Sequence, residues 1–363
     1  MNLELTEEQV ALRDTVRRYL AEKASLAAYV RPLLDGGSGG GDDVWRGLAA
    51  LGVTGMLVPE EFDGAGMTMV EAGVVAEELG AALYPGPWSS SAVAATRALL
   101  HTGAGRNAAT LLTGIADGSA IATVGPLGGA RPSAIETDNG TVLRGAITGL
   151  ADAAVADVIL VFADERNGAA LFSVYASSAG VDSAACAHVD QTRRLSDIEF
   201  RDAPAQRLAS ACLDEITAVV DDVMIVHAAD AVGAAAAVMN LAIEYAKVRR
   251  QFDQPIGSFQ AVQHLCVDMY EAVELARSGV IHALWAADAA EPAERHLAAL
   301  RAKAFAGRLT AVGDTSIQIF GGIGFTWEHD AHLYLKRLLG WSGFLGAPDR
   351  YLEEVGAALA RVQ

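Results

Sequence analysis

The pattern of apolar residues near the N-terminus predicts helices. Apolar side chains there recur at the spacing of a helix with one buried face. Thr6 and Gln9, just before this run, have the spacing of a capping box, so we expect the helix to begin there. A glycine-rich run at 36–41 predicts a loop, after which helical patterning resumes. We therefore expect a helical domain over residues 1–119.

The middle of the chain changes to a pattern typical of strands. Short runs of β-branched and aromatic residues are separated by Gly, Asp, Asn and Pro, the residues that form turns. The clearest runs are Thr141–Leu143, Val158–Phe162, Leu171–Tyr175 and Ile198–Phe200. Residues 120–210 are expected to form a small antiparallel β domain.

The last part of the chain, residues 211–363, is again helical. Its expected helices cover residues 213–249, 258–289, 293–318, 328–339 and 348–361. Long helices packed side by side are typical of a bundle. The expected fold class is mainly α with a small β domain: an N-terminal helical domain, a middle antiparallel β domain and a C-terminal four-helix-type bundle.

Composition narrows the classes of function. Acidic residues number 45 and basic residues 27, for a net charge of −18. This charge argues against a partner such as nucleic acid or an anionic membrane surface. The three cysteines are far apart and form no cluster with histidine, so we expect neither a disulfide framework nor a metal site. The N-terminus lacks the apolar core of a signal peptide, and charges interrupt every long apolar stretch. A cytoplasmic protein without a membrane span is expected.

Three motifs with glycine, arginine and glutamine stand out. One is the segment Gly52–Gly66, which contains Gly-x-x-Gly followed by Pro-Glu-Glu. The other two lie on separate expected helices of the bundle, and their principal residues are Arg249, Phe252, Gln260, Gln318, Gly321 and Gly322. In order and spacing these motifs resemble those of the acyl-CoA dehydrogenase family, and the resemblance covers nearly the whole chain.

The resemblance implies FAD as cofactor, an acyl-CoA thioester as substrate and α,β-dehydrogenation in fatty acid or lipid catabolism. It also implies a homo- or hetero-oligomer, a dimer or tetramer, and an electron-accepting flavoprotein as partner. In the family, the two bundle motifs of one subunit hold the ADP half of the FAD bound in its neighbour. Arginine suits the pyrophosphate because its planar fork donates two hydrogen bonds, and glycines let backbone N–H groups approach phosphate oxygens.

Plainer interpretations of the same residues stay open. Arg249 alone could be a solvated residue at a helix end, and the glycines from Gly321 onward could simply stop a helix. The charged run Asp190–Arg194 fits either a turn or a contact with an anion. His227 fits a packed or exposed histidine better than a ligand.

The expected catalytic base is where the sequence departs from the family. A glutamate removes the substrate's α-proton, and the family places it at one of two positions. Alignment with the motifs puts these at Leu345 and Val223, and neither side chain can accept a proton. Asp222 is adjacent to Val223, but one residue along a helix turns the side chain by about 100°. Asp222 is therefore a weak candidate.

The segments that face the flavin ring in the family have also changed. They correspond here to Val124–Arg131 and Gly149–Ala151, and the family's threonine, serine and tryptophan are missing. The chain thus keeps the motifs that in the family contact a neighbour's FAD, and it lacks the residues that in the family contact the flavin bound in the same subunit. Three hypotheses follow: a subunit of a hetero-oligomer that lacks its own glutamate, a self-sufficient homo-oligomeric dehydrogenase with an unconventional base, or a non-catalytic scaffold of the same fold.

Overall fold

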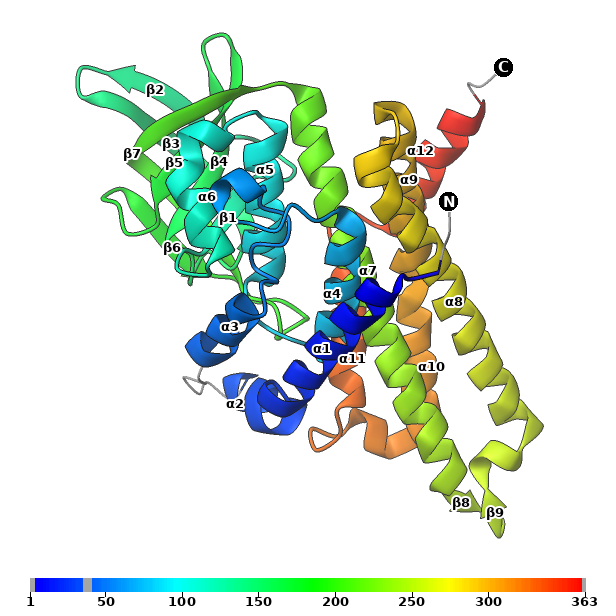
Figure 1. Cartoon of the computed structure of the whole chain (residues 1–363). Coiled ribbons are helices and arrows are strands. Elements are labelled where there is room, and N and C mark those ends of the chain that lie inside the picture. Colours follow the sequence, from blue (N-terminus) through cyan, green and yellow to red (C-terminus); the bar gives the residue numbers. More distant parts are fainter. Residues whose placement is uncertain (1–3, 35–40, 361–363) are drawn as a thin grey trace.

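The computed structural model describes residues 4–34 and 41–360 (Figure 1). A β-sheet lies on one side of the molecule and the long helices lie on the other. The N-terminal helices pack against both. This order of helices, sheet and bundle confirms the expected fold class. Most of the glycine-rich run expected to form a loop lies outside the described residues.

The N-terminal part begins at the predicted capping box. Helix α1 (Glu7–Lys23) starts after Thr6, whose hydroxyl accepts a hydrogen bond from the Gln9 backbone N–H, while the Gln9 side chain accepts one from the Thr6 N–H. The other helices of this part are α2 (Arg31–Leu34), α3 (Gly41–Ala50), α4 (Met69–Ala81), α5 (Thr96–His101) and α6 (Ala109–Ala116).

The middle part is a seven-stranded sheet that contains all four predicted runs. Its strands are β1 (Ala122–Gly125), β2 (Ser133–Thr137), β3 (Gly140–Ala151), β4 (Val158–Glu165), β5 (Gly168–Tyr175), β6 (Val181–Ala185) and β7 (Leu195–Ala211). The sheet is mixed rather than purely antiparallel. Strand β1 arrives from helix α6 instead of from a hairpin, and it pairs with β4 in parallel.

The bundle holds six helices in the described part of the chain. They are α7 (Leu213–Val248), α8 (Gln260–Ala289), α9 (Pro292–Ala306), α10 (Thr310–Phe320), α11 (Ala331–Gly343) and α12 (Pro348–Ala360). The prediction of one helix over 293–318 was wrong, because a 3₁₀ turn separates α9 from α10. At this turn Gly307 lies against Pro348, and a Cβ on Gly307 would collide with the proline ring.

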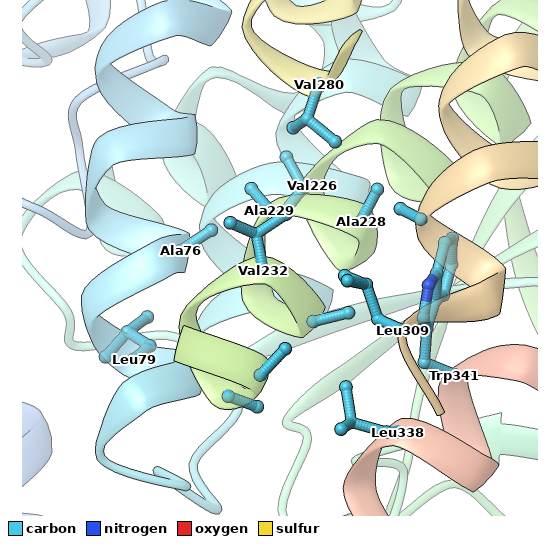
Figure 2. Close-up of a cluster of buried hydrophobic side chains, with 14 of the residues drawn as sticks. Ala76, Leu79, Val226, Ala228, Ala229, Val232, Val280, Leu309, Leu338 and Trp341 are labelled. Carbon is cyan, nitrogen blue, oxygen red and sulfur yellow. The ribbon is translucent and has the colours of Figure 1, made fainter. Parts of the chain in front are cut away.

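Helix α7 forms the centre of the core (Figure 2). Figure 2 shows its Ala229 and Val232 facing Ala76 of α4. The two backbones touch, because a Cβ on Gly80 would collide with the Asp230 backbone and a Cβ on Gly233 would collide with the Glu77 backbone. Small residues on both helices permit this approach, which joins the N-terminal part to the bundle.

Helix α7 is also the one helix in the described residues that is long and apolar enough to cross a membrane. Of its most apolar stretch, 83% is buried inside the protein. Its apolarity is therefore explained by its central place in the core.

Candidate functional site

One end of the bundle collects the predicted cofactor residues (Figure 1). Helix α7 ends at Val248 with Arg249 as its C-cap, and the small hairpin of β8 (Arg250–Gln251) and β9 (Gln254–Pro255) leads into α8. The rings of Tyr245 on α7 and Phe320 on α10 lie 5.0 Å apart. This contact brings the glycine motif that follows Phe320 to the end of the bundle where Arg249 lies.

The polar side chains at this end of the bundle are exposed to solvent. The side chains of Arg249, Gln260 and Gln318 are exposed, and none has a hydrogen-bond partner within residues 4–34 and 41–360. Gly321 has φ +64°, and a Cβ added at Gly321 or Gly322 would meet no other atom within 4 Å. The surface therefore offers a cation, two amides and an open stretch of backbone, a suitable set for a phosphate-containing ligand.

Apolar side chains surround these polar groups. Phe252 is 87% exposed, Phe325 74% and Val248 72%. Phe252 and Asp253 both have positive φ, at 51° and 62°. Such values occur in the tight hairpin turns that favour Asn-Gly. Together these side chains form an exposed apolar surface, a feature typical of interaction sites.

A cavity of about 360 Å³ lies between the sheet and the bundle. The family's two base positions, Val223 on α7 and Leu345 after α11, both line it. Segments 123–129 and 147–151 of the β domain form the opposite wall. The cavity thus brings together the segments that the resemblance assigned to the flavin and substrate site.

No carboxylate lines this cavity among the residues that the structure describes. Among the described residues its polar side chains are the hydroxyls of Ser89, Ser90, Thr123 and Thr148, the imidazole of His227 and the guanidinium of Arg350. An added Cβ at Gly129 or Gly149 would meet nothing within 4 Å, so the backbone of this wall is open at both glycines. The motif comparison with the family gave no sign of the hydroxyls that Thr123 and Thr148 contribute to this wall, because both residues lie just outside the compared segments 124–131 and 149–151.

Asp222 does not reach the cavity. Its buried carboxylate lies 2.5 Å from Arg97 Nε, 2.6 Å from Arg295 Nη2 and 2.8 Å from His101 Nε2. Burial raises the pKa of Asp222, but Arg97, His101 and Arg295 outweigh burial and hold that pKa below its usual range. Asp221 is also turned away, toward His296 at 3.0 Å. Both acids are committed to ion pairs, so the weak candidate base belongs to the framework.

A second cavity, of about 370 Å³, adjoins the first. Its wall includes Arg193, which pairs with Asp230 at 2.7 Å, and the buried Arg337, which lies 3.4 Å from both Asp190 and Asp230. These charges neutralise one another within the chain. Arg193 therefore has a partner of its own, which weakens its interpretation as an anion contact, whereas Arg194 lines the same cavity and is exposed.

His227 lines both cavities. Its ring stacks on Phe344 at 4.7 Å between centroids. Burial lowers the pKa of His227 well below its usual range, and nearby Arg193 and Arg337 lower it further, so the imidazole is neutral at pH 7. The sequence held a signal for this placement, because His227 lies one helical turn after Val223 and so shares its face of α7.

Comparison with known proteins agrees with this geometry. Residues 6–119 match the family model described as acyl-CoA dehydrogenase, N-terminal domain, and residues 217–359 match acyl-CoA dehydrogenase, C-terminal domain. The chain belongs to the acyl-CoA dehydrogenase family. It is accordingly an FAD-dependent oxidoreductase by family.

Individual relatives cover almost the whole chain. Acyl-CoA dehydrogenase IpdE2 of Mycobacterium tuberculosis is 33% identical over 350 residues, 96% of each chain. Acyl-CoA dehydrogenase FadE34 of the same organism is 36% identical over 97% of this chain, which spans only 48% of FadE34. A chain of the ChsE4-ChsE5 complex from M. tuberculosis superposes with a TM-score of 0.88 at 27% identity, covering 100% of both chains.

Proposed function

We propose that this chain is the subunit of a hetero-oligomeric acyl-CoA dehydrogenase that lacks the catalytic glutamate and completes the FAD site of a related subunit. The observation that carries the proposal is the cavity that contains both base positions, because no carboxylate lines it among the described residues. Removal of an α-proton requires such a base. The partner subunit supplies it.

The length of α7 supports an arrangement of two chains. Val223 lies in the first half of this helix, and Arg249 is its C-cap. At about 1.5 Å of rise per residue, the helix separates the two by roughly 39 Å. A single copy therefore cannot bring its own Arg249 to its own cavity. The cofactor residues at the end of the bundle need a second chain to act on.

Each residue at that end has a role toward the partner's cofactor. FAD, when bound, accepts the substrate's β-hydrogen as hydride. Arg249 would hold the pyrophosphate of the cofactor, because its guanidinium can donate two hydrogen bonds, and Gln260 and Gln318 would hold neighbouring polar atoms. Gly321 and Gly322 let backbone N–H groups approach the phosphates, while Phe252 packs into the partner's surface.

The comparisons support this proposal. One similar structure is a complex with two named components, ChsE4 and ChsE5. We propose by analogy that the partner here is a related acyl-CoA dehydrogenase subunit that has the glutamate, that an electron-accepting flavoprotein reoxidises the assembly, and that the assembly works in the cytoplasm. The sequestration of Asp222 and Asp221 in ion pairs disfavours a self-sufficient enzyme that uses either as base.

The test is to express the chain alone and together with related chains that contain the glutamate. Purified samples are compared for flavin content and for acyl-CoA oxidation with an artificial electron acceptor. Because general-base catalysis contributes about 10²–10⁴-fold, we expect the chain alone to be at least about 100-fold slower than the assembly. Full turnover by the chain alone would favour the self-sufficient alternative, and an assembly without flavin would favour the scaffold.

A further inference from the structure

Lys303 of α9 is a fully buried lysine. Its exposed fraction is 0%, and among the described residues no carboxylate forms an ion pair with it. Its Nζ donates hydrogen bonds to the carbonyl oxygens of Trp341, at 2.6 Å, and Ser342, at 3.2 Å. It also lies 3.9 Å from the centre of the Trp341 ring. Such an expensive burial calls for a reason beyond packing.

The two carbonyls belong to the last turn of α11, where a positive charge is stabilised by the helix dipole. The Trp341 carbonyl also accepts a hydrogen bond from the Phe344 backbone N–H, at 3.1 Å. Directly after this turn come Phe344 and Leu345, which form part of the cavity wall. The other end of this wall segment contacts α12, where the Tyr351 hydroxyl donates a hydrogen bond to the Leu345 carbonyl at 2.7 Å. Lys303 and Tyr351 thus hold the wall segment from its two ends.

We propose that Lys303 is a positioning residue whose charge holds the end of α11, so that the shape of the cavity wall at Phe344 and Leu345 depends on whether Lys303 is protonated. This role concerns the chain itself and does not depend on a partner or on bound FAD. Figure 2 shows the Trp341 ring at the edge of the core cluster, where it can report on this contact.

The charge of Lys303 changes in the neutral range. Burial lowers the pKa of Lys303 to about 7. Two titratable groups on facing helices are His227 of α7, which becomes charged only well below pH 6.5, and Tyr351 of α12, whose pKa burial raises. Neither changes charge near pH 7. Above pH 7 the ammonium becomes an amine, and its bonds to the two carbonyls weaken because hydrogen bonds from charged donors are the stronger ones.

A second group on α9 itself also titrates close to this range. His296 lies two turns before Lys303, and its hydrogen bond to Asp221 of α7 raises the pKa of His296 above its usual value. Glu354 of α12 adds to the same increase. Any pH-dependent signal must therefore be tested in a variant without this histidine.

The first test uses tryptophan fluorescence of the full chain between pH 5.5 and 9. We expect a step near pH 7 that disappears in Trp341→Phe, in Lys303→Met and in Lys303→Arg. Two controls should retain the step: Trp327→Phe, because Trp327 lies near Lys336 instead, and His296→Gln. Absence of a step in the native chain, its survival in Lys303→Met or its loss in His296→Gln would overturn the proposal.

Hydrogen exchange supplies the second test, and it distinguishes positioning from simple packing. After correction for intrinsic rates, amides of the segment 341–346 should exchange about five- to tenfold faster at pH 8.5 than at pH 5.5. In Lys303→Arg, which stays charged, the two rates should be equal. Equal rates in the native chain would contradict the proposal even if a variant fails to fold.

Discussion

The two ends of α7 present opposite chemistry. Toward its C-terminal end, the side chains of Arg249, Gln260 and Gln318 are exposed and have no partner among the described residues. Toward its N-terminal end, Val223 faces a cavity whose lining in the described chain includes no carboxylate. On the proposed function, the exposed groups serve another subunit, and the cavity lacks the base that this chain would need for its own substrate. The contrast teaches that the residues expected to bind a cofactor and the residues expected to remove a proton can be tested separately, at opposite ends of one helix.

The strongest challenge to this contrast is Asp222, the acid nearest to a base position. We expect Asp222→Asn to lower the free energy of unfolding by about 3–5 kcal/mol, because it leaves buried Arg97 and Arg295 partly uncompensated. Urea unfolding measures this loss. The control is Asp268→Asn on the exposed face of α8. Its unfolding free energy should change by less than about 0.5 kcal/mol. A catalytic Asp222 would show the reverse: a stable variant with its activity abolished.

At the opposite end of α7, Arg249→Ala tests the contact with the partner's cofactor. Loss of a charge-assisted hydrogen bond should weaken FAD binding in the assembly by about 1.5–3 kcal/mol, roughly ten- to a hundredfold. Lys247→Ala removes another exposed cation two residues earlier and should leave FAD affinity unchanged. FAD titration of the apo-assembly gives both values, and equal affinities for native and Arg249→Ala protein would remove the arginine from the site.

Gly322→Ala should have a smaller effect, because it adds a single methyl group and removes no charge. Within the described chain an added methyl group at Gly322 meets nothing within 4 Å. The stability of the chain alone should therefore change by less than about 0.5 kcal/mol. If the partner's FAD occupies this space, overpacking should weaken FAD binding by about 1–3 kcal/mol. An unchanged FAD affinity would show that the backbone at Gly322 does not approach the cofactor.

The smallest expected effect is the pH dependence of stability that His227, in the cavity wall, should cause. The folded-state pKa of His227 is lowered, so its burial costs stability once the pH falls below the unfolded value of about 6.5. Relative to His227→Phe, native protein should therefore lose at most about 1.4 kcal/mol of stability per pH unit below about 6.5. Denaturant unfolding at pH 7.5, 6.0 and 5.0 measures the difference. Parallel pH dependence of the two proteins would show that His227 is not held neutral.

Much of the fold was predictable because local signals agreed with the final packing. The capping box at Thr6 starts α1, and the predicted bundle helices over 213–249 and 258–289 match α7 and α8 to within two residues. Val223 and Leu345, which the sequence predicts at base positions, line one cavity although they lie far apart in the sequence. Their assignment as base positions stays a prediction.

The remaining features depend on contacts between distant residues. Nothing near Gly307 in the sequence indicates its contact with Pro348, so the break between α9 and α10 was missed. Likewise, Asp222 and Arg97 are 125 residues apart, and their ion pair exists only after α5 has packed on α7. A carboxylate next to an expected base position is a candidate base in the sequence, whereas in space it is held by Arg97, Arg295 and His101.

The backbone contact between Gly80 of α4 and Gly233 of α7 bears on the order in which the parts of the chain can pack during synthesis. During synthesis Gly233 leaves the ribosome long after Gly80, with a delay on the order of ten seconds at ordinary rates of translation. For that interval the face of α4 that α7 will cover has no permanent neighbour, while the strands that lie between them in the sequence are already emerging. The β domain has time to form first, and the arrival of α7 then closes the N-terminal helices and the bundle around a common core.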